Sequence, residues 1–308
     1  MLTAKHRLSS KLTRRQFIPM ATAAFAAPTK PSLAITMDDV NWKVIPRPHV
    51  DDNILAALRE YGNLKAALFP VGQSVDNERG HAILDAWNRE GHMIGNHTWS
   101  HKGYNSVETA WFEQDMLRNE ALLKSWPSFR KFFRFPALKE GKTAEKRDEM
   151  RQFLADHGYR NGHVTIDASD WYYDQRLRAR LEAEPGFDVN RYREPYLNHL
   201  WDRATYYAGL AHRVLGHAIP HTILVHYNLI NSLFLGDVLA MFQTRGWNLV
   251  PASQAYEDAV FLRQPQIAPA GESLVWALAK ETGKFDSVLR YPGEDDVYEK
   301  PILDRLGL

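Results

Sequence analysis

Short β-type runs alternate with longer helix-like runs through most of this chain, and this alternation constrains the fold more than any other feature of the sequence. The strand-like runs are Ser32–Met37, Leu64–Val71, His92–Asn96, Lys131–Arg134, Gly162–Ile166, Thr222–Tyr227 and Trp247–Val250. The helix-like runs are Asp51–Tyr61, Asn77–Glu90, Val107–Ser125, Thr143–His157, Glu194–Leu215 and Ser232–Arg245. Strands separated by helices predict an α/β fold with a parallel sheet or barrel of about seven strands.

The start of the chain predicts an export signal. Arg14 and Arg15 resemble the twin-arginine motif, an apolar stretch follows, and Ala24-Phe25-Ala26 offers a small-residue cleavage site. The apolar stretch is too short to cross a bilayer, which needs about 20 residues. We therefore expect residues 1–27 to direct a bacterial protein to the periplasm or the cell exterior. A basic disordered tail is the alternative.

The end of the chain departs from the alternation. Residues 263–308 lose the strand–helix pattern and carry Pro265, Pro269, Pro292 and Pro301. We expect a main domain over residues 28–262 with residues 263–308 as an extension packed on it. The stretch Asp174–Pro220 is long for one connection, so we expect a helical insertion there.

Composition and charge exclude several classes of protein. The chain has no Cys, which excludes a disulfide scaffold, a zinc ribbon and a thiol nucleophile, so any metal must be held by His, Asp or Glu. The formal net charge is +1, and residues 1–26 hold five basic and no acidic side chains, so the rest of the chain is net acidic. We expect neither nucleic-acid binding nor stable membrane insertion.

Polar residues follow the first and third predicted strands. Asp38 and Asp39 come directly after the first, and two adjacent carboxylates can divide cation binding and proton transfer between them. His97 and His101 follow the third strand, and a helical turn would place both imidazoles on one face, as a divalent ion needs. His217 and His221 have the same spacing, but Pro220 disrupts a helical turn there, so we interpret that pair as structural.

Further polar groups follow later strands. They are Arg134-Phe135-Pro136, then Asp167 with Asp170-Trp171, then His226 at the end of an apolar run. Each group is common in proteins when taken alone. In a barrel, however, residues just beyond the strand ends line the open mouth, which would bring these groups together.

Taken in order, these motifs resemble those of the polysaccharide deacetylase family with its NodB-homology domain. The resemblance covers roughly residues 31–260. It implies a distorted (β/α) barrel and a metal-dependent hydrolase, commonly with zinc. Such enzymes remove N- or O-acetyl groups from chitin-, peptidoglycan- or xylan-type glycans, so an acetylated glycan or oligosaccharide is the expected partner.

The resemblance also implies roles for single residues. Asp39, His97 and His101 would hold the metal. Asp38 would be the general base with Arg134 as its partner, and His226 the general acid, oriented by Asp170. Leu224 would line the pocket for the acetyl methyl. From the chemistry of the reaction, we expect the Ala137 amide to stabilise the oxyanion and Trp171 to offer a stacking face to a sugar ring.

Departures from the family pattern leave the substrate open. Met37 and Val40 stand where the family usually has Phe and Gly around the Asp pair, and Ala137 stands where a Tyr is often found. An amidase of the same fold acting on a small non-sugar amide is one alternative. A catalytically inactive carbohydrate-binding relative is another.

Overall fold

The computed structural model describes residues 30–45, 50–290 and 295–308, so the predicted export signal lies outside the described residues. Within them, the main sheet has seven strands in the order β6-β4-β3-β2-β1-β7, with β8 pairing the start of β1, and every pairing is parallel. The strands are β1 (Ser32–Asp39), β2 (Ala67–Pro70), β3 (Met93–Asn96), β4 (Phe129–Phe133), β6 (Arg160–Asn161), β7 (Pro220–His226) and β8 (Asn248–Leu249). The predicted α/β fold with about seven parallel strands is confirmed.

The chain after β6 closes the sheet into a distorted barrel. The amides of Thr165 and Ile166 donate to the carbonyl of Thr222 in β7 at 3.1 and 2.9 Å, and Leu224 donates back to Ile166 at 3.0 Å. The prediction of one strand over 162–166 is therefore wrong. The chain leaves β4 at one edge of the sheet just before this segment, and the end of the segment pairs with β7 at the other edge. Gly162 marks the bend, where a Cβ would lie 2.7 Å from the Phe69 ring.

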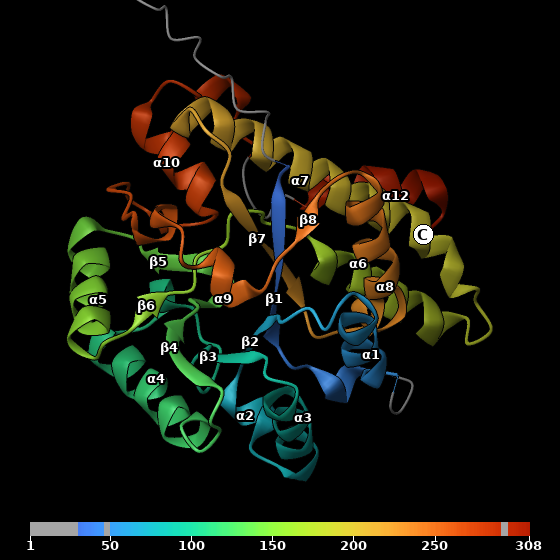
Figure 1. Ribbon diagram of the computed structural model, residues 1–308, viewed down its shortest axis with the longest axis horizontal. Coiled ribbons are helices and arrows are strands. Elements are labelled where there is room, and N and C mark those ends of the chain that lie inside the picture. Colours follow the sequence, from blue (N-terminus) through green and yellow to red (C-terminus); the bar gives the residue numbers. More distant parts are fainter. Residues whose placement is uncertain (1–29, 46–49, 291–294) are drawn as a thin grey trace, which may run out of the picture.

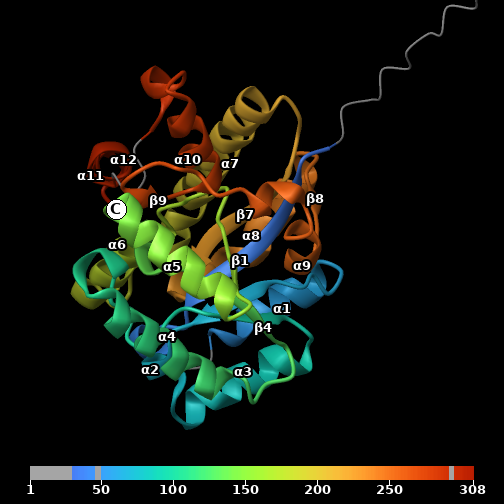
Figure 2. The same ribbon diagram turned by 90° about the vertical axis from the view of Figure 1, so that its left-hand side faces the viewer.

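Helices surround the curved sheet (Figure 1). They are α1 (Asp52–Glu60), α2 (Gly72–Val75), α3 (Glu78–Arg89), α4 (Thr109–Leu123), α5 (Ala144–Asp156), α6 (Asp170–Ala183), α7 (Arg193–Leu215), α8 (Leu229–Thr244), α9 (Ala252–Ala255), α10 (Leu274–Thr282), α11 (Asp295–Tyr298) and α12 (Lys300–Leu306). The view turned by 90° shows α4 and α5 covering the sheet near β4 (Figure 2). The expected helical insertion corresponds to α6 and α7, and α6 begins earlier, at Asp170.

The central strand explains why the sheet forms where it does. Residues 33–37 of β1 are at most 1% exposed, and β2 and β7 flank the strand at its two edges. A continuous apolar run is what a parallel strand buried on both faces requires. The apolar run ends at Asp38 and Asp39, so the strand delivers two carboxylates to the mouth of the barrel.

The C-terminal segment packs on this body in two ways. β9 (Ala270–Gly271) pairs antiparallel with β5 (Lys139–Gly141), and the Glu272 amide donates to the Leu138 carbonyl at 2.9 Å. α10 packs on α7, and the side chains of α10 join the main hydrophobic core. None of the helices in the described ranges combines the length and apolar character needed to span a membrane.

Candidate active site

A cavity of about 760 Å³ opens where the parallel strands end. The predicted site residues on its wall are Asp38, Asp39, His97, His101, Ala137, Trp171, Leu224 and His226. Arg134 and Asp170 lie behind this wall, where they contact Asp38 and His226 respectively. The structure therefore brings every predicted site residue into one place, as the mouth of a barrel should.

Asp39, His97 and His101 form a group that could hold a metal ion, with ligand atoms within 4.8 Å of one another. Asp39 Oδ1 lies 3.4 Å from His97 Nε2 and 3.2 Å from His101 Nε2. No other group of three candidate ligands converges in this way among the residues that the structure describes. His221, of the second His pair, is instead buried in β7 against Thr165.

The local geometry of the two imidazoles differs from the predicted helical turn. Residues 97–101 form a loop in which Thr98 and His101 have left-handed backbones, with φ of 64° and 60°. The Asn96 side chain turns the chain here by accepting a hydrogen bond from the Thr98 amide at 3.0 Å. The helical-turn prediction was wrong, but the imidazole rings still contact each other edge to face, with centroids 4.8 Å apart.

Both imidazoles direct Nε2 toward Asp39 Oδ1. His97 Nδ1 lies 2.7 Å from the Arg134 carbonyl, which can only accept, so Nδ1 carries a proton and Nε2 is the nitrogen that remains to bind a metal. For His101, burial and the neighbouring His97 lower the pKa, although Asp39 opposes this. The neutral imidazole that ligates metals is thus the favoured form of His101.

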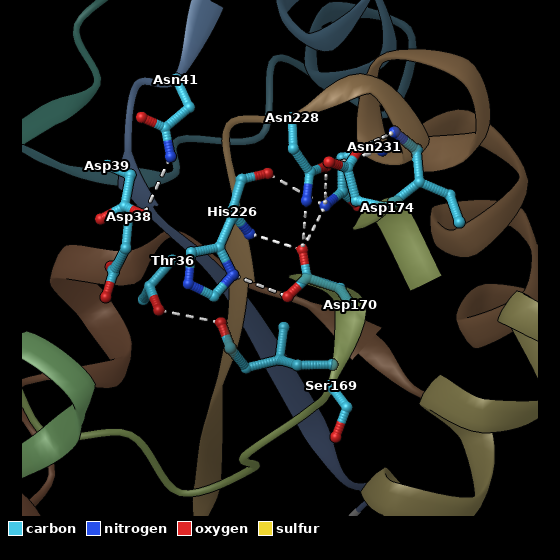
Figure 3. Close-up of polar contacts among 12 residues, drawn as sticks. Thr36, Asp38, Asp39, Asn41, Ser169, Asp170, Asp174, His226, Asn228 and Asn231 are labelled. Carbon is cyan, nitrogen blue, oxygen red and sulfur yellow. Dashed lines mark hydrogen bonds and ion pairs between the residues drawn. The ribbon is translucent and has the colours of Figure 1, made fainter. Parts of the chain in front are cut away.

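Asp39 has an oxygen that fits a cation. Its Oδ2 accepts a hydrogen bond from Asn41 at 3.2 Å (Figure 3). No donor among the described residues satisfies the buried Oδ1. A buried carboxylate oxygen without a partner is costly unless a cation pairs with it. Burial raises the pKa of Asp39, but His97, His101 and His226 together hold it well below its usual value, so the ligating carboxylate form dominates.

Asp38 is held by Arg134 rather than by the imidazoles. Arg134 Nη1 donates to both carboxylate oxygens of Asp38 at 3.0 Å, and both residues are at most 2% exposed. The Arg134 fork also donates to the Gly162 carbonyl at 2.6 Å and to Thr36 at 3.1 Å. The guanidinium therefore balances a buried carboxylate and fixes its position 3.7 Å from His97 Nε2.

His226 and Asp170 form a second pair across the cavity (Figure 3). Asp170 Oδ1 lies 2.7 Å from His226 Nδ1, while Oδ2 accepts from the His226 amide at 2.7 Å. Burial lowers the pKa of His226, but Asp170, helped by Asp39 and Asp38, raises it to about 10. His226 is therefore an imidazolium at neutral pH in the metal-free protein, with its Nε2 proton available to the cavity.

The three predicted substrate contacts differ in exposure. Leu224 is 7% exposed on β7, and Trp171 is 43% exposed on the first turn of α6. Ala137 follows Pro136 in a short 3₁₀ turn with a left-handed φ of 52°. The roles assigned to these residues, and to the others above, stay predictions.

The sequence did not single out several residues that complete the site. Asn228 and Asn231 each donate to Asp170 Oδ2, at 3.0 and 2.8 Å. The spacing of these two residues is typical of a helix N-cap, and Asn228 indeed caps α8, which is the signal that could have found them. Lys139 and Glu272 form an ion pair on the cavity wall, so the C-terminal segment contributes to the site as well.

Comparison with known proteins agrees with this geometry. The family model for polysaccharide deacetylase matches residues 26–162 of this chain, which confirms the resemblance that its motifs indicate. The matched region includes Asp38, Asp39, His97, His101 and Arg134. Asp170 and His226 lie beyond it, so their pairing rests on the structure.

Two curated relatives are similar to part of the chain. Both are named peptidoglycan-N-acetylglucosamine deacetylase and come from Bacillus cereus. The first is 27% identical over 150 residues, covering 48% of this chain and 50% of that protein, and the second is 29% identical over 126 residues, covering 41% and 55%. The chain thus spans about half the length of the curated relatives it matches.

Solved structures share the fold. A peptidoglycan N-acetylglucosamine deacetylase crystallised in complex with a benzamide compound has a TM-score of 0.50 at 19% identity, covering 76% of this chain and 91% of that one. A CE4 family pseudoenzyme from Bacillus anthracis has a TM-score of 0.51 at 16% identity, covering 74% and 66%. A mutant of a CE4 family pseudoenzyme with restored enzymatic activity reaches 0.52 at 15% identity, covering 74% and 68%. At these identities the likeness shows the fold alone.

Proposed function

We propose that this chain is a metal-dependent hydrolase that removes acetyl groups from a glycan, with the N-acetyl group as its main target. One observation carries the proposal. A carboxylate held by an arginine, a group of three metal-ligating side chains and a histidine–carboxylate pair converge on one cavity. Acyl transfer needs a base, an electrophile and an acid within reach of one carbonyl, which is what this set supplies.

Asp39, His97 and His101 would hold the ion, for which we propose zinc. A bound divalent cation supplies Lewis acidity toward the acetyl carbonyl oxygen. Asp38 accepts a proton from the attacking water while Arg134 keeps its carboxylate in place. The water oxygen bonds to the acetyl carbon, and the negative charge that develops on the carbonyl oxygen is stabilised by the Ala137 amide.

His226 completes the reaction by donating its Nε2 proton to the departing nitrogen as the carbon–nitrogen bond breaks. Asp170 keeps the imidazole protonated and oriented by holding Nδ1, as in other histidine–carboxylate pairs. Leu224 would pack against the acetyl methyl, and Trp171 would stack on a sugar ring. The products are acetate and a free amino sugar.

The substrate proposal rests on the relatives and on the cavity. Relatives named for N-acetylglucosamine of peptidoglycan favour an amide-linked acetyl group on a hexosamine. A volume of about 760 Å³ is within the range of sites that enclose small ligands. Such glycans are found outside the cytoplasm. We also propose that Arg14 and Arg15 direct the export of the protein to that location.

The test is an acetate-release assay of the zinc-loaded protein against chitooligomers, peptidoglycan and acetylated xylan, with a panel of small amides alongside. The Asp38→Asn variant serves as the inactive control. Acetate from chitooligomers or peptidoglycan supports the proposal. Hydrolysis of small amides alone would indicate the amidase instead, and no release from any substrate by protein that binds zinc would indicate an inactive relative.

A further inference from the structure

A buried ionic cluster connects the C-terminal segment to the active site. Glu299, at the start of α12, is 4% exposed and receives three donors from α6 and α7. Arg203 Nη2 donates to Oε1 at 2.9 Å, His199 Nδ1 lies 3.0 Å from Oε2, and the Tyr173 hydroxyl donates to Oε2 at 3.3 Å. Burial raises the pKa of Glu299, but His199 and Arg203 lower it to about 2, so it is a carboxylate at neutral pH.

The contacts of His199 fix its tautomer. Nε2 accepts a hydrogen bond from the Ser169 amide at 2.9 Å, and an amide can only donate, so Nε2 carries no proton. In the neutral imidazole the proton is then on Nδ1, where it is donated to Glu299. The carboxylate of Glu299 therefore selects the one tautomer that can hold the Ser169 amide.

Ser169 stands directly before Asp170, at the point where the chain enters α6 (Figure 3). The imidazole of His199 is the partner of the Ser169 amide at this junction, so it helps to set where α6 begins. Asp170 is fully buried and contacts His226 at 2.7 Å through each of its two oxygens. A small shift of the junction would change both contacts together.

We propose that Glu299 is a positioning residue for the active site and that it acts through His199. This inference rests on the proposed function insofar as it concerns turnover. Glu299 holds the tautomer of His199, and His199 holds the backbone at Ser169. The backbone there determines how Asp170 meets His226. The C-terminal segment thus takes part in holding the proton donor, in addition to covering the barrel.

The direct test replaces the carboxylate with an amide of the same shape. Glu299→Gln should lower kcat on an N-acetylated substrate by about 10- to 100-fold with little change in KM, the usual effect of losing an outer partner of a site residue. NMR of isotope-labelled histidine should show altered ring signals for both His199 and His226. Leu303→Ala is the matched control, because Leu303 is a fully buried side chain of the same helix outside the cluster. It should leave the His226 signals unchanged.

A second pair of variants separates positioning from packing. His199→Gln places a carbonyl oxygen near the position of Nε2 and should retain the Ser169 contact, whereas His199→Asn reaches only the position of Nδ1 and should lose it. We expect activity and His226 signals close to wild type for His199→Gln, and the Glu299→Gln behaviour for His199→Asn. The two His199 variants leave Glu299 and Arg203 in contact. They therefore test the positioning role by themselves if Glu299→Gln does not fold.

The NMR measurement needs no turnover, which keeps the two proposals distinguishable. If Glu299→Gln and His199→Asn shift the His226 signals but the wild-type protein releases no acetate, the positioning role is sustained and the proposed function is refuted. Conversely, unshifted His226 signals in both Glu299→Gln and His199→Asn, in an active enzyme, would refute the positioning role alone. A shift of the same size in Leu303→Ala would also refute it, because general loosening of α12 would then account for the effect.

Discussion

Asp170→Asn tests the proton donor most sharply, because the four donors around Asp170 determine how the new amide must sit. The His226 amide, Asn228 and Asn231 all donate to Oδ2, so the carbonyl oxygen of the new side chain has to take that place. Its NH₂ group must then face His226 Nδ1, which can only accept if it has no proton. In the imidazolium form, the Nδ1–H of His226 would point at the NH₂ group of the new amide. Two donors would then face each other, so this form is disfavoured.

The magnitude follows from the pKa of His226. In the metal-free protein it is raised to about 10, and without the carboxylate it should fall toward the ordinary value of about 6.5, because Asp170 supplies most of the opposition to burial and only the smaller effects of Asp39 and Asp38 remain. That fall corresponds to about 5 kcal/mol of lost preference for the imidazolium. At pH 8 the protonated fraction of His226 would drop from about 99% to about 3%.

The assay is an NMR titration of His226 in metal-free protein, since a bound cation would itself oppose protonation. Asp174→Asn is the matched control: it makes the same change in the same helix, at a buried carboxylate that contacts Arg178 and the Ile230 amide. A His226 pKa above about 8 in Asp170→Asn, or an equal fall in Asp174→Asn, would refute the reasoning.

The kinetic counterpart uses two substrates with the zinc-loaded enzyme. Asp170→Asn should move the alkaline limb of kcat toward lower pH and reduce turnover of an acetylated amine more than that of an activated ester, whose departing oxygen needs little protonation. Equal losses on both substrates with an unshifted limb would remove His226 from the role of general acid.

Three further outcomes are expected. His101→Ala should weaken zinc binding by at least about 10-fold in a chelator competition while circular dichroism stays unchanged, because this side chain is 39% exposed. Asp38→Asn should lower kcat by about 10²–10⁴ with zinc content unchanged; loss of the zinc instead would exchange the roles of the two aspartates. In metal-free protein, the folded pKa of His226 exceeds the unfolded value of about 6.5. The His226–Asp170 pair therefore stabilises fully below about pH 6.5 and is lost as the pH rises through about 10. The urea midpoint should fall over that window, and less so in Asp170→Asn.

The strand–helix alternation was sufficient to predict most of the sheet, because the central strands are buried and mostly apolar, with the hydroxyl of Thr36 satisfied by the Ile223 carbonyl. It failed at residues 162–166, where two short pairings with different partners replace one strand. That segment is determined by closure of the barrel, with Gly162 fitting against Phe69, and no local pattern encodes a choice between two distant edges. The first turn of α6 was also missed, since Asp170 is a weak helix former whose position serves its contacts.

The candidate site was predictable for a different reason. Its residues come from segments nearly 190 residues apart between Asp38 and His226, and only their resemblance in order to a known family joined them. What the order could not supply was geometry. The loop of residues 97–101 replaces the expected helical turn because Asn96 accepts the Thr98 amide. Contacts such as Glu299 with His199 join two segments of α-helix with no recognisable motif in either.

Backbone strain is concentrated at this site. Among the described residues, most non-glycine positions with left-handed φ line the cavity: Asp39, His101, Ala137, Leu138 and Glu272. Val40 and Thr98 follow lining residues directly in the sequence. Such conformations persist only where the surroundings hold them. Here Val71 and Asn41 hold the first loop through backbone hydrogen bonds to Asp39 and Tyr227, at 3.3 and 3.2 Å.

Val40 shows how the chain tolerates this strain. Its φ of 62° costs a β-branched residue about 1–2 kcal/mol, which explains why glycine would be expected after the aspartate pair. The Val40 side chain is fully buried in the main core, and that burial contributes about 1.5–3 kcal/mol. The two terms are of similar size with burial slightly larger, so valine can hold the same left-handed turn. Core packing beneath the loop can thus replace the conformational freedom of glycine and keep Asp38 and Asp39 directed into the cavity.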